Sequence, residues 1–174
     1  MNIALFLGGT SPEKEVSKSS SKSIYAALTN LGYNVILMNP AYGADQPKNI
    51  NDFFAEKDYA SISNENYLET VNSKQLDNID LVFLGLHGKW GEDGTIQSLL
   101  ELKGKKYTCS KVLASSLSMD KKMSKILFQH YDIKTPKWIS IPKNNFEPDQ
   151  VLAMIKKNLG YPCVIKPNDQ GSTV

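Results

Sequence analysis

The sequence predicts an α/β fold built around a parallel sheet, on the strength of two observations. Short, continuous apolar runs occur at residues 3–7, 35–38 and 81–86, and they have the length and composition of buried strands. Apolar residues recur at helical spacing between the first two of these runs. A strand, a helix and a second strand in this order are typical of a parallel unit. We therefore expect a Rossmann-like first domain.

The first half of the chain gives three expected elements and one irregular stretch. The strand at 3–7 ends at two glycines, as expected where a buried strand enters a tight turn. A helix is predicted over residues 16–31, and Gly32 supplies its stop signal. After the strand at 35–38, residues 39–78 are polar and have no sustained period, so they predict loops and short elements.

The second half continues the alternation and then changes. After the strand at 81–86 we expect a helix closed by Gly104, and residues 107–109 are consistent with one more strand. The first core is expected to end near Ser115, so we assign the first domain to residues 1–116.

Residues 117–174 predict the beginning of a second domain. A helix is expected to carry four apolar side chains on one face, strands are expected at 138–141 and 163–166, and another helical stripe lies between them. The last strand runs into a glycine turn without a following partner, so we expect this domain to be incomplete. The four apolar side chains are those of Met119, Met123, Ile126 and Leu127.

Composition excludes several classes of protein. The net charge of +2 gives no reason to expect a nucleic-acid or membrane-surface partner. Cys109 and Cys163 stand far apart and outside any zinc pattern, which favours a reducing compartment without metal ligands. No apolar run approaches the roughly 20 residues that cross a bilayer. We expect a cytoplasmic location.

The turn at residues 8–13 (GGTSPE) is a candidate binding site because it follows a strand and opens a helix. It lacks the glycine pattern of a dinucleotide site, which disfavours a dehydrogenase, and Glu13 favours a cationic guest such as an ammonium group. The structural alternative is a capping box between Thr10 and Glu13. The two interpretations are compatible, and both remain open at this stage.

The segment 87–94 (HGKWGEDG) follows the strand at 81–86 and should therefore lie beside the first turn. His87 is the catalytic candidate, because a titratable ring ends a buried strand at this edge. Glu92 and Asp93 precede a helix, whose positive end attracts carboxylates, and their alternative role is to cap that helix.

Lysines and glycines later in the chain are candidates for binding phosphate. Lys166 ends an apolar strand beside the turn at Gly171 and Ser172, whose backbone amides could hold phosphate oxygens. Lys121 lies at the start of a helix, where taken alone it would be part of a solvated face.

Taken in this order, residues 8–17, 87–101, 107–125 and 164–174 resemble the D-alanine:D-alanine ligases of the ATP-grasp superfamily. The resemblance implies that residues 1–116 are the small domain that precedes the ATP-grasp fold. Residues 117–174 would begin its α+β central, nucleotide-binding domain.

The resemblance also implies roles for individual residues. Glu13 would meet the ammonium of the first D-alanine, with Val16 in the same substrate site, and His87 would lie near that substrate's carboxylate. The remaining implied contacts are those of Lys121, Lys166, Gly171 and Ser172 with ATP, and Ser172 would also be catalytic and substrate-binding.

In such ligases ATP phosphorylates the first D-alanine, and the second D-alanine attacks the acylphosphate to give the dipeptide used in peptidoglycan. The resemblance implies ATP and Mg²⁺ as cofactors, with the metal ligands beyond Val174, and a homodimer formed through the first domain. We therefore expect residues 1–174 alone to be inactive. The alternatives are a D-alanine:D-lactate or D-alanine:D-serine ligase, or a dimer-forming fragment without chemistry.

Overall fold

The computed structural model describes residues 1–144 and 146–171, which fall into two compact units. The first unit comprises residues 1–119 together with Gln170 and Gly171, and the second comprises residues 120–169. Among the described residues, no helix combines the length and the apolar character needed to cross a membrane.

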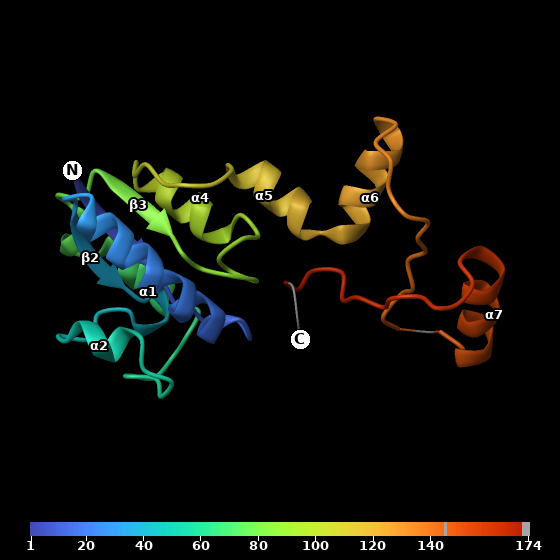
Figure 1. The fold of residues 1–174 in the computed structure, drawn as a ribbon, viewed down its shortest axis with the longest axis horizontal. Helices are drawn as coiled ribbons and strands as arrows, with labels where there is room; N and C mark the ends of the chain where they lie inside the picture. The colour runs from blue at the N-terminus through green and yellow to red at the C-terminus, as the bar shows by residue number, and fades with distance from the viewer. Residues whose placement is uncertain (145, 172–174) are drawn as a thin grey trace. The chain divides into compact units, whose positions relative to one another are not determined.

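The first unit is built on a parallel sheet of three strands, which confirms the predicted α/β fold (Figure 1). The strands are β1 (Asn2–Phe6), β2 (Asn34–Met38) and β3 (Leu81–Leu84), in the order β2-β1-β3. In the register of the sheet, Ile3 of the central strand lies opposite Val35 on one side and Leu81 on the other. Parallel pairing brings the carboxyl ends of all three strands to one edge.

Helices connect these strands, and the stretch at 39–78 contains short elements as predicted. Helix α1 (Lys14–Asn30) joins β1 to β2, and Gly32 follows it with φ 82°. The stretch from 39 to 78 contains the 3₁₀ turns η1 (Pro40–Tyr42) and η2 (Lys74–Leu76) and the helices α2 (Ile50–Phe53) and α3 (Asn66–Asn72). Helices α4 (Thr95–Leu102) and α5 (Val112–Met119) complete the first unit.

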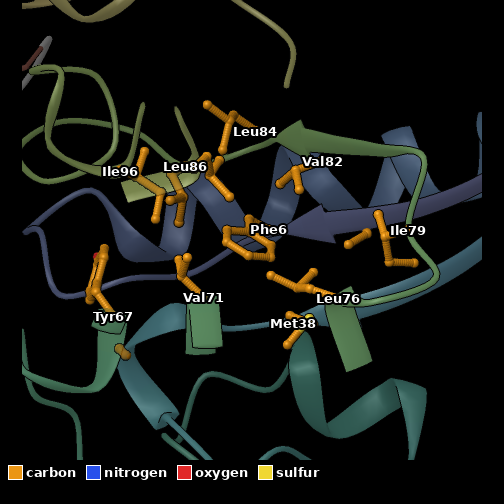
Figure 2. Close-up of a cluster of buried hydrophobic side chains, with 13 residues drawn as sticks. Phe6, Met38, Tyr67, Val71, Leu76, Ile79, Val82, Leu84, Leu86 and Ile96 are labelled. Atoms are coloured by element: carbon orange, nitrogen blue, oxygen red, sulfur yellow. The ribbon is translucent and has the colours of Figure 1, made fainter. Parts of the chain in front are cut away.

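Side chains of β1 alternate between two apolar clusters, as the period of a strand requires. Ala4 and Phe6 belong to a cluster that also contains Met38, Tyr67 and side chains from β3 and α4 (Figure 2). Leu5 and Leu7 belong to the second cluster, against which side chains of α1 pack. The central strand is therefore buried on both faces, which explains its uninterrupted apolar sequence.

The predicted strand at 107–109 is reduced to a single bridge. Val82 pairs with Tyr107, and backbone hydrogen bonds join Val82 to Lys106 and Thr108 at 2.8 and 3.0 Å. Cys109 then turns the chain with φ 79°, a left-handed conformation that ends strand pairing and that a residue with a side chain seldom adopts.

The second unit contains α6 (Lys121–His130) and α7 (Pro148–Asn158). Met119 belongs to α5 rather than to the following helix, because Asp120 adopts an extended conformation and caps α6. The strands predicted at 138–141 and 163–166 are wrong: within residues 120–144 and 146–169 neither segment forms a strand. A strand is stabilised by hydrogen bonds to a neighbour, which an apolar sequence alone does not supply.

Candidate active site

The turn after β1 is held by side chains from three other segments. The N–H groups of residues 8–10 donate in order to Ser17 Oγ at 2.8 Å, Asn39 Oδ1 at 2.9 Å and the Tyr67 hydroxyl at 3.2 Å. An anion-binding turn needs unengaged N–H groups pointing at the ligand. These three are already engaged, so they do not offer a phosphate site.

Both glycines of this turn are required by its geometry. Gly8 and Gly9 have φ of 76° and 84°. A Cβ added to Gly8 would lie 2.4 Å from Asn39 Nδ2, and one added to Gly9 would lie 2.7 Å from the Tyr67 hydroxyl. The pair thus combines left-handed backbone with close approach of the side chains that hold the turn.

The predicted capping box between Thr10 and Glu13 is wrong. The Thr10 hydroxyl donates to Asn64 Oδ1, and the N–H of Glu13 donates to Ser11 Oγ at 3.1 Å. Glu13 is itself the N-cap residue of α1 and makes no side-chain cap bond. The local pattern failed because Thr10 found a partner 54 positions away and Ser11 took over its local role.

The turns after β1 and β3 meet at the same sheet edge. The Ser11 hydroxyl donates to the carbonyl oxygen of His87 at 2.7 Å. A Cβ added to Gly88, which has φ 71°, would lie 2.4 Å from Glu13 Oε2. The carboxylate of Glu13 therefore packs directly against the backbone of the second turn, and the structure brings Glu13 and His87 together.

His87 itself is half-buried, and its Nε2 lies 3.0 Å from Ser20 Oγ on α1. The two acidic residues of the same loop have structural partners. Glu92 Oε2 accepts from the N–H of Gly88 at 2.6 Å, and the Asp93 carboxylate accepts from the N–H groups of residues 90 and 95 at 3.0 Å each. Both carboxylates thus hold backbone of their own loop, and only Asp93 reaches the helix, at the N–H of Thr95. The capping alternative therefore fits Asp93 and is wrong for Glu92, since the N-cap residue of α4 is Gly94.

Gly171 also lies against Glu13. A Cβ added to Gly171 would fall 1.7 Å from Glu13 Oε2, so only a glycine fits beside the carboxylate in this arrangement. The first unit thus brings Gly171, a predicted phosphate-binding residue, to the predicted ammonium site. Ser172, for which three roles were expected, lies outside the described residues.

Val16 is placed on the first turn of α1, three positions after Glu13. Residues three apart lie on neighbouring parts of a helix surface. The side chain of Val16 is 57% exposed, so it is accessible on the face that Glu13 begins.

In the second unit, the neighbourhoods of Lys121 and Lys166 meet. The N–H groups of Lys121 and Lys122 donate to the carbonyl oxygen and to Oδ1 of Asn168, at 3.0 and 2.9 Å. Asn168 follows Lys166 by two positions, so the chain after Lys166 lies at the start of α6. Lys121 is half-buried and Lys166 is exposed.

The start of α6 is closed by the chain's own oxygen atoms. Besides the bonds to Asn168, the N–H of Met123 donates to Asp120 Oδ1 at 2.9 Å. This hydrogen bond, supported by others from Asn168 and Lys122, holds the pKa of Asp120 below its ordinary value. A phosphate near Lys121 and Lys166 would therefore be met by ammonium groups rather than by the amides of this helix end.

A charged cluster fixes α1 to the loop at 55–58. Lys18 is only 2% exposed, and its Nζ donates to the carbonyl oxygen of Ala55 at 2.8 Å and to Glu15 at 2.9 Å. Asp58 pairs with both Lys14 and Lys18. Burial alone would lower the pKa of Lys18, but its bond to Glu15 and the surrounding charges raise that pKa. Burial alone would raise the pKa of Asp58, but the two lysines lower it.

The side chains from residues 39–67 that hold the first turn were not predicted from the sequence. Asn39 could have been found, because it is a polar residue directly after a buried strand and hence at the same sheet edge as the site. Asn64 and Tyr67 carry no local signal, since their roles depend on where a polar stretch folds back. Tyr67 is 3% exposed, and this burial raises the pKa of its hydroxyl.

No metal site is present among residues 1–144 and 146–171. No group of three or more His, Cys, Asp or Glu side chains is placed there to hold an ion. The carboxylates beside the first two turns are instead engaged with backbone N–H groups or packed against glycines.

Comparison with known proteins agrees with this arrangement. The family described as "D-ala D-ala ligase N-terminus" matches residues 2–110. A D-alanine–D-alanine ligase of Moorella thermoacetica is 37% identical over 176 residues, covering 100% of this chain and 48% of the relative. The chain thus spans about half the length of the curated relative it matches.

Solved structures give the same result. The D-alanine–D-alanine ligase of Bacillus anthracis has a TM-score of 0.68 at 32% identity, covering 100% of this chain and 47% of its own. Its complex with ATP gives 0.67 at 30%, covering 98% and 48%. The D-alanyl-alanine synthetase A of Vibrio cholerae gives 0.61 at 25%, covering 90% and 44%. The chain therefore belongs to the D-alanine–D-alanine ligase family and corresponds to its amino-terminal part.

Proposed function

We propose that this chain supplies the first-substrate site of a ligase that joins two D-alanine molecules in an ATP-dependent reaction, through an acylphosphate, for peptidoglycan synthesis. The observation that supports this proposal most strongly is the placement of the Glu13 carboxylate between Gly88 and Gly171, beside His87. The relatives named D-alanine–D-alanine ligase support the same reaction.

The charge of this site favours an ammonium group as its ligand. Glu13 brings a half-buried carboxylate, while the N–H groups of residues 8–10 are already engaged by side chains. A site with negative charge and without unengaged amides attracts a cation and repels phosphate. We therefore assign Glu13 to the ammonium of the first D-alanine, with Val16 lining the same side.

His87 is assigned to the carboxylate end of this substrate. Its ring lies on the turn that contacts Glu13, so one small amino acid could meet both side chains. An imidazolium donates hydrogen bonds from both ring nitrogens and pairs well with a carboxylate. We retain Ser172 as the proposed catalytic residue of the covering loop.

We assign the ATP phosphates to the side chains of Lys121 and Lys166, and we retain Gly171 as a proposed ATP-binding residue on the strength of the family resemblance alone. Asn168 connects the two lysines through the start of α6, and the Bacillus anthracis relative has a structure in complex with ATP. Ammonium groups would offset the negative charge that moves between oxygens during phosphoryl transfer. Mg²⁺ is proposed to accompany ATP, and we assign none of its ligands to residues 1–144 or 146–171.

We extend the proposal to the setting of the enzyme: a homodimer formed through the first domain, in the cytoplasm, without a nucleic-acid or membrane partner. In this proposal residues 1–116 are the domain that precedes the ATP-grasp fold, and residues 117–174 begin the central domain.

The first experiment incubates the purified 174-residue chain with ATP, Mg²⁺ and D-alanine. We expect no dipeptide, because no metal-ligand group is present among the described residues and about half of the relatives' length is missing from the chain. Sustained formation of D-alanyl-D-alanine by these residues alone would contradict this part of the proposal.

The second experiment replaces the aligned half of the Bacillus anthracis ligase with residues 1–174 and compares Glu13→Gln with Glu56→Gln. Removing a charge-assisted hydrogen bond should lower kcat/KM for D-alanine by about 10- to 100-fold. Glu56 is exposed and has no recorded side-chain contact, so its variant should retain the activity of the parent chimera. Equal activity of the two variants would remove Glu13 from substrate binding.

A further inference from the structure

The hydroxyl of Ser20 lies at hydrogen-bond distance from three atoms at once. Its Oγ is 3.0 Å from the carbonyl oxygen of Val16, 3.2 Å from that of Ser17, and 3.0 Å from Nε2 of His87. Ser20 is half-buried on α1, so this contact joins the helix to the turn after β3.

The proton count at Ser20 distinguishes the two ways of arranging these contacts. A serine hydroxyl has one proton and two lone pairs, and a backbone carbonyl can only accept. If the proton pointed to His87, two carbonyl oxygens would face the serine oxygen with no proton between them. If the proton points to the carbonyls, as serines in helices commonly do, the serine oxygen accepts from an Nε2–H of His87.

We propose that Ser20 is a positioning residue that fixes the neutral ring of His87 as the Nε2–H tautomer and leaves Nδ1 for a ligand. Within the described part of the chain, residues 1–144 and 146–171, Nδ1 has no hydrogen-bond partner. The assignment of the tautomer does not depend on the proposed ligase function. The use of Nδ1 to bind a substrate carboxylate rests on that proposed function.

This arrangement would let Nδ1 of His87 either accept or donate a hydrogen bond without rotation of the ring. In the neutral ring Nδ1 accepts a hydrogen bond, and in the protonated ring it donates one, while Nε2–H stays on Ser20 in both states. A carboxylate would accept a hydrogen bond from Nδ1–H of the protonated form, so Ser20 would determine which ring nitrogen meets the substrate.

The test measures imidazole ¹⁵N chemical shifts in the 174-residue chain at about pH 8.5, where an ordinary imidazole is neutral. The chain has two histidines, so a His130→Gln variant assigns the signals. We expect Nε2–H to dominate at His87. In Ser20→Ala the share of the Nδ1–H form should rise at least two-fold, whereas Ser20→Thr, which keeps the hydroxyl, should retain the original ratio. Ser19→Ala is the matched control, because Ser19 is exposed on the same helix.

A dominant Nδ1–H form in the unchanged chain would overturn the proposal, as would an unchanged ratio in Ser20→Ala. If Ser20→Ala did not fold, the unchanged chain would still decide the matter, because a share of the Nδ1–H form equal to or above that of a free histidine side chain would overturn the proposal and a smaller share would support it. The measurement needs neither ATP nor D-alanine nor turnover. Its failure is therefore distinguishable from failure of the proposed ligase function.

Discussion

The hydroxyl of Ser11 donates to the carbonyl oxygen of His87 at 2.7 Å, and Ser11 Oγ also accepts from the N–H of Glu13 at 3.1 Å. One side chain, itself 4% exposed, thus connects the turn after β1 to the turn after β3. This contact therefore helps to set the separation between Glu13 and His87.

Replacing Ser11 with Ala should lower the free energy of unfolding by about 1–2 kcal/mol, because the half-buried carbonyl oxygen of His87 and the half-buried N–H of Glu13 both lose their partner. Urea unfolding followed by circular dichroism measures this change. Ser19→Ala, on the exposed face of α1, should stay within about 0.5 kcal/mol of the parent chain. Similar losses in the two variants would mean that the Ser11 contact contributes little.

Replacing Gly88 with Ala should cost more than the same change at Gly104. The two glycines have nearly the same φ, 71° and 70°, so each replacement pays about 1–2 kcal/mol of backbone strain. Only at Gly88 would the new Cβ also meet Glu13 Oε2, whereas nothing lies within 4 Å at Gly104. The difference between the two unfolding free energies therefore measures the contacts of the new methyl group at Gly88, of which the one with Glu13 is the shortest.

Combining Gly88→Ala with Glu13→Ala should recover part of that difference, since the carboxylate that obstructs the methyl group is gone. A double-mutant cycle on the free energy of unfolding gives the coupling directly. Strictly additive losses would indicate that Glu13 does not pack against this turn.

The first unit could be predicted from sequence to a useful extent, because its central strand is buried on both faces and its helices form through contacts between residues close in sequence. Strand β1 and the stop at Gly32 illustrate this: burial and positive φ leave direct marks on the residue type. The strands expected at 138–141 and 163–166 had the right residue types, but pairing is a non-local property. Val164 and Ile165, 79% and 78% exposed, have apolar side chains without the neighbour that a strand needs.

In the candidate site, too, some features could be predicted from the sequence and others depended on distant residues. Proximity of the turns that contain Glu13 and His87 followed from parallel topology alone, which brings strand ends to one edge. The failed capping box between Thr10 and Glu13 had a suitable local pattern, but Asn64 competed for the Thr10 hydroxyl from far along the chain. Long-range competition of this kind leaves no signature in a window of a few residues.

Replacing Asp58 with Asn should destabilise the chain by about 1–3 kcal/mol at pH 7, because the buried Lys18 loses one charged partner. The pKa of Asp58 is lowered from 3.8 by its lysines, so the carboxylate stabilises the fold above pH 3.8. This contribution disappears as pH falls through the lowered pKa of the folded state.

The unfolding free energies of the parent and Asp58→Asn should therefore differ at pH 7 and converge as pH falls below the lowered pKa of Asp58 in the folded state. Thermal unfolding across this range measures the difference. Asp45→Asn, at an exposed position without a recorded side-chain bond, is the control and should follow the parent throughout. A gap that persisted undiminished in acid would contradict the assigned charge pairing.

In the chimera with the Bacillus anthracis ligase, Lys166→Met should raise the KM for ATP by about 10-fold or more, because an ammonium that pairs with phosphate is removed. Lys143→Met removes the same charge from an exposed position of the same unit and should leave KM unchanged. An equal effect of both variants would point to general electrostatics rather than to a phosphate contact. Steady-state kinetics at saturating D-alanine separates these outcomes.

The hydroxyl of Tyr67 and the amide of Asn64 reach the turn after β1 from a stretch whose composition resembles solvated surface. Swapping residues 39–78 between homologues would therefore exchange side chains that hold the turn after β1, although no residue that we assign to substrate lies within them. Engineers who graft the GGTSPE turn onto another scaffold should transfer both segments as a pair.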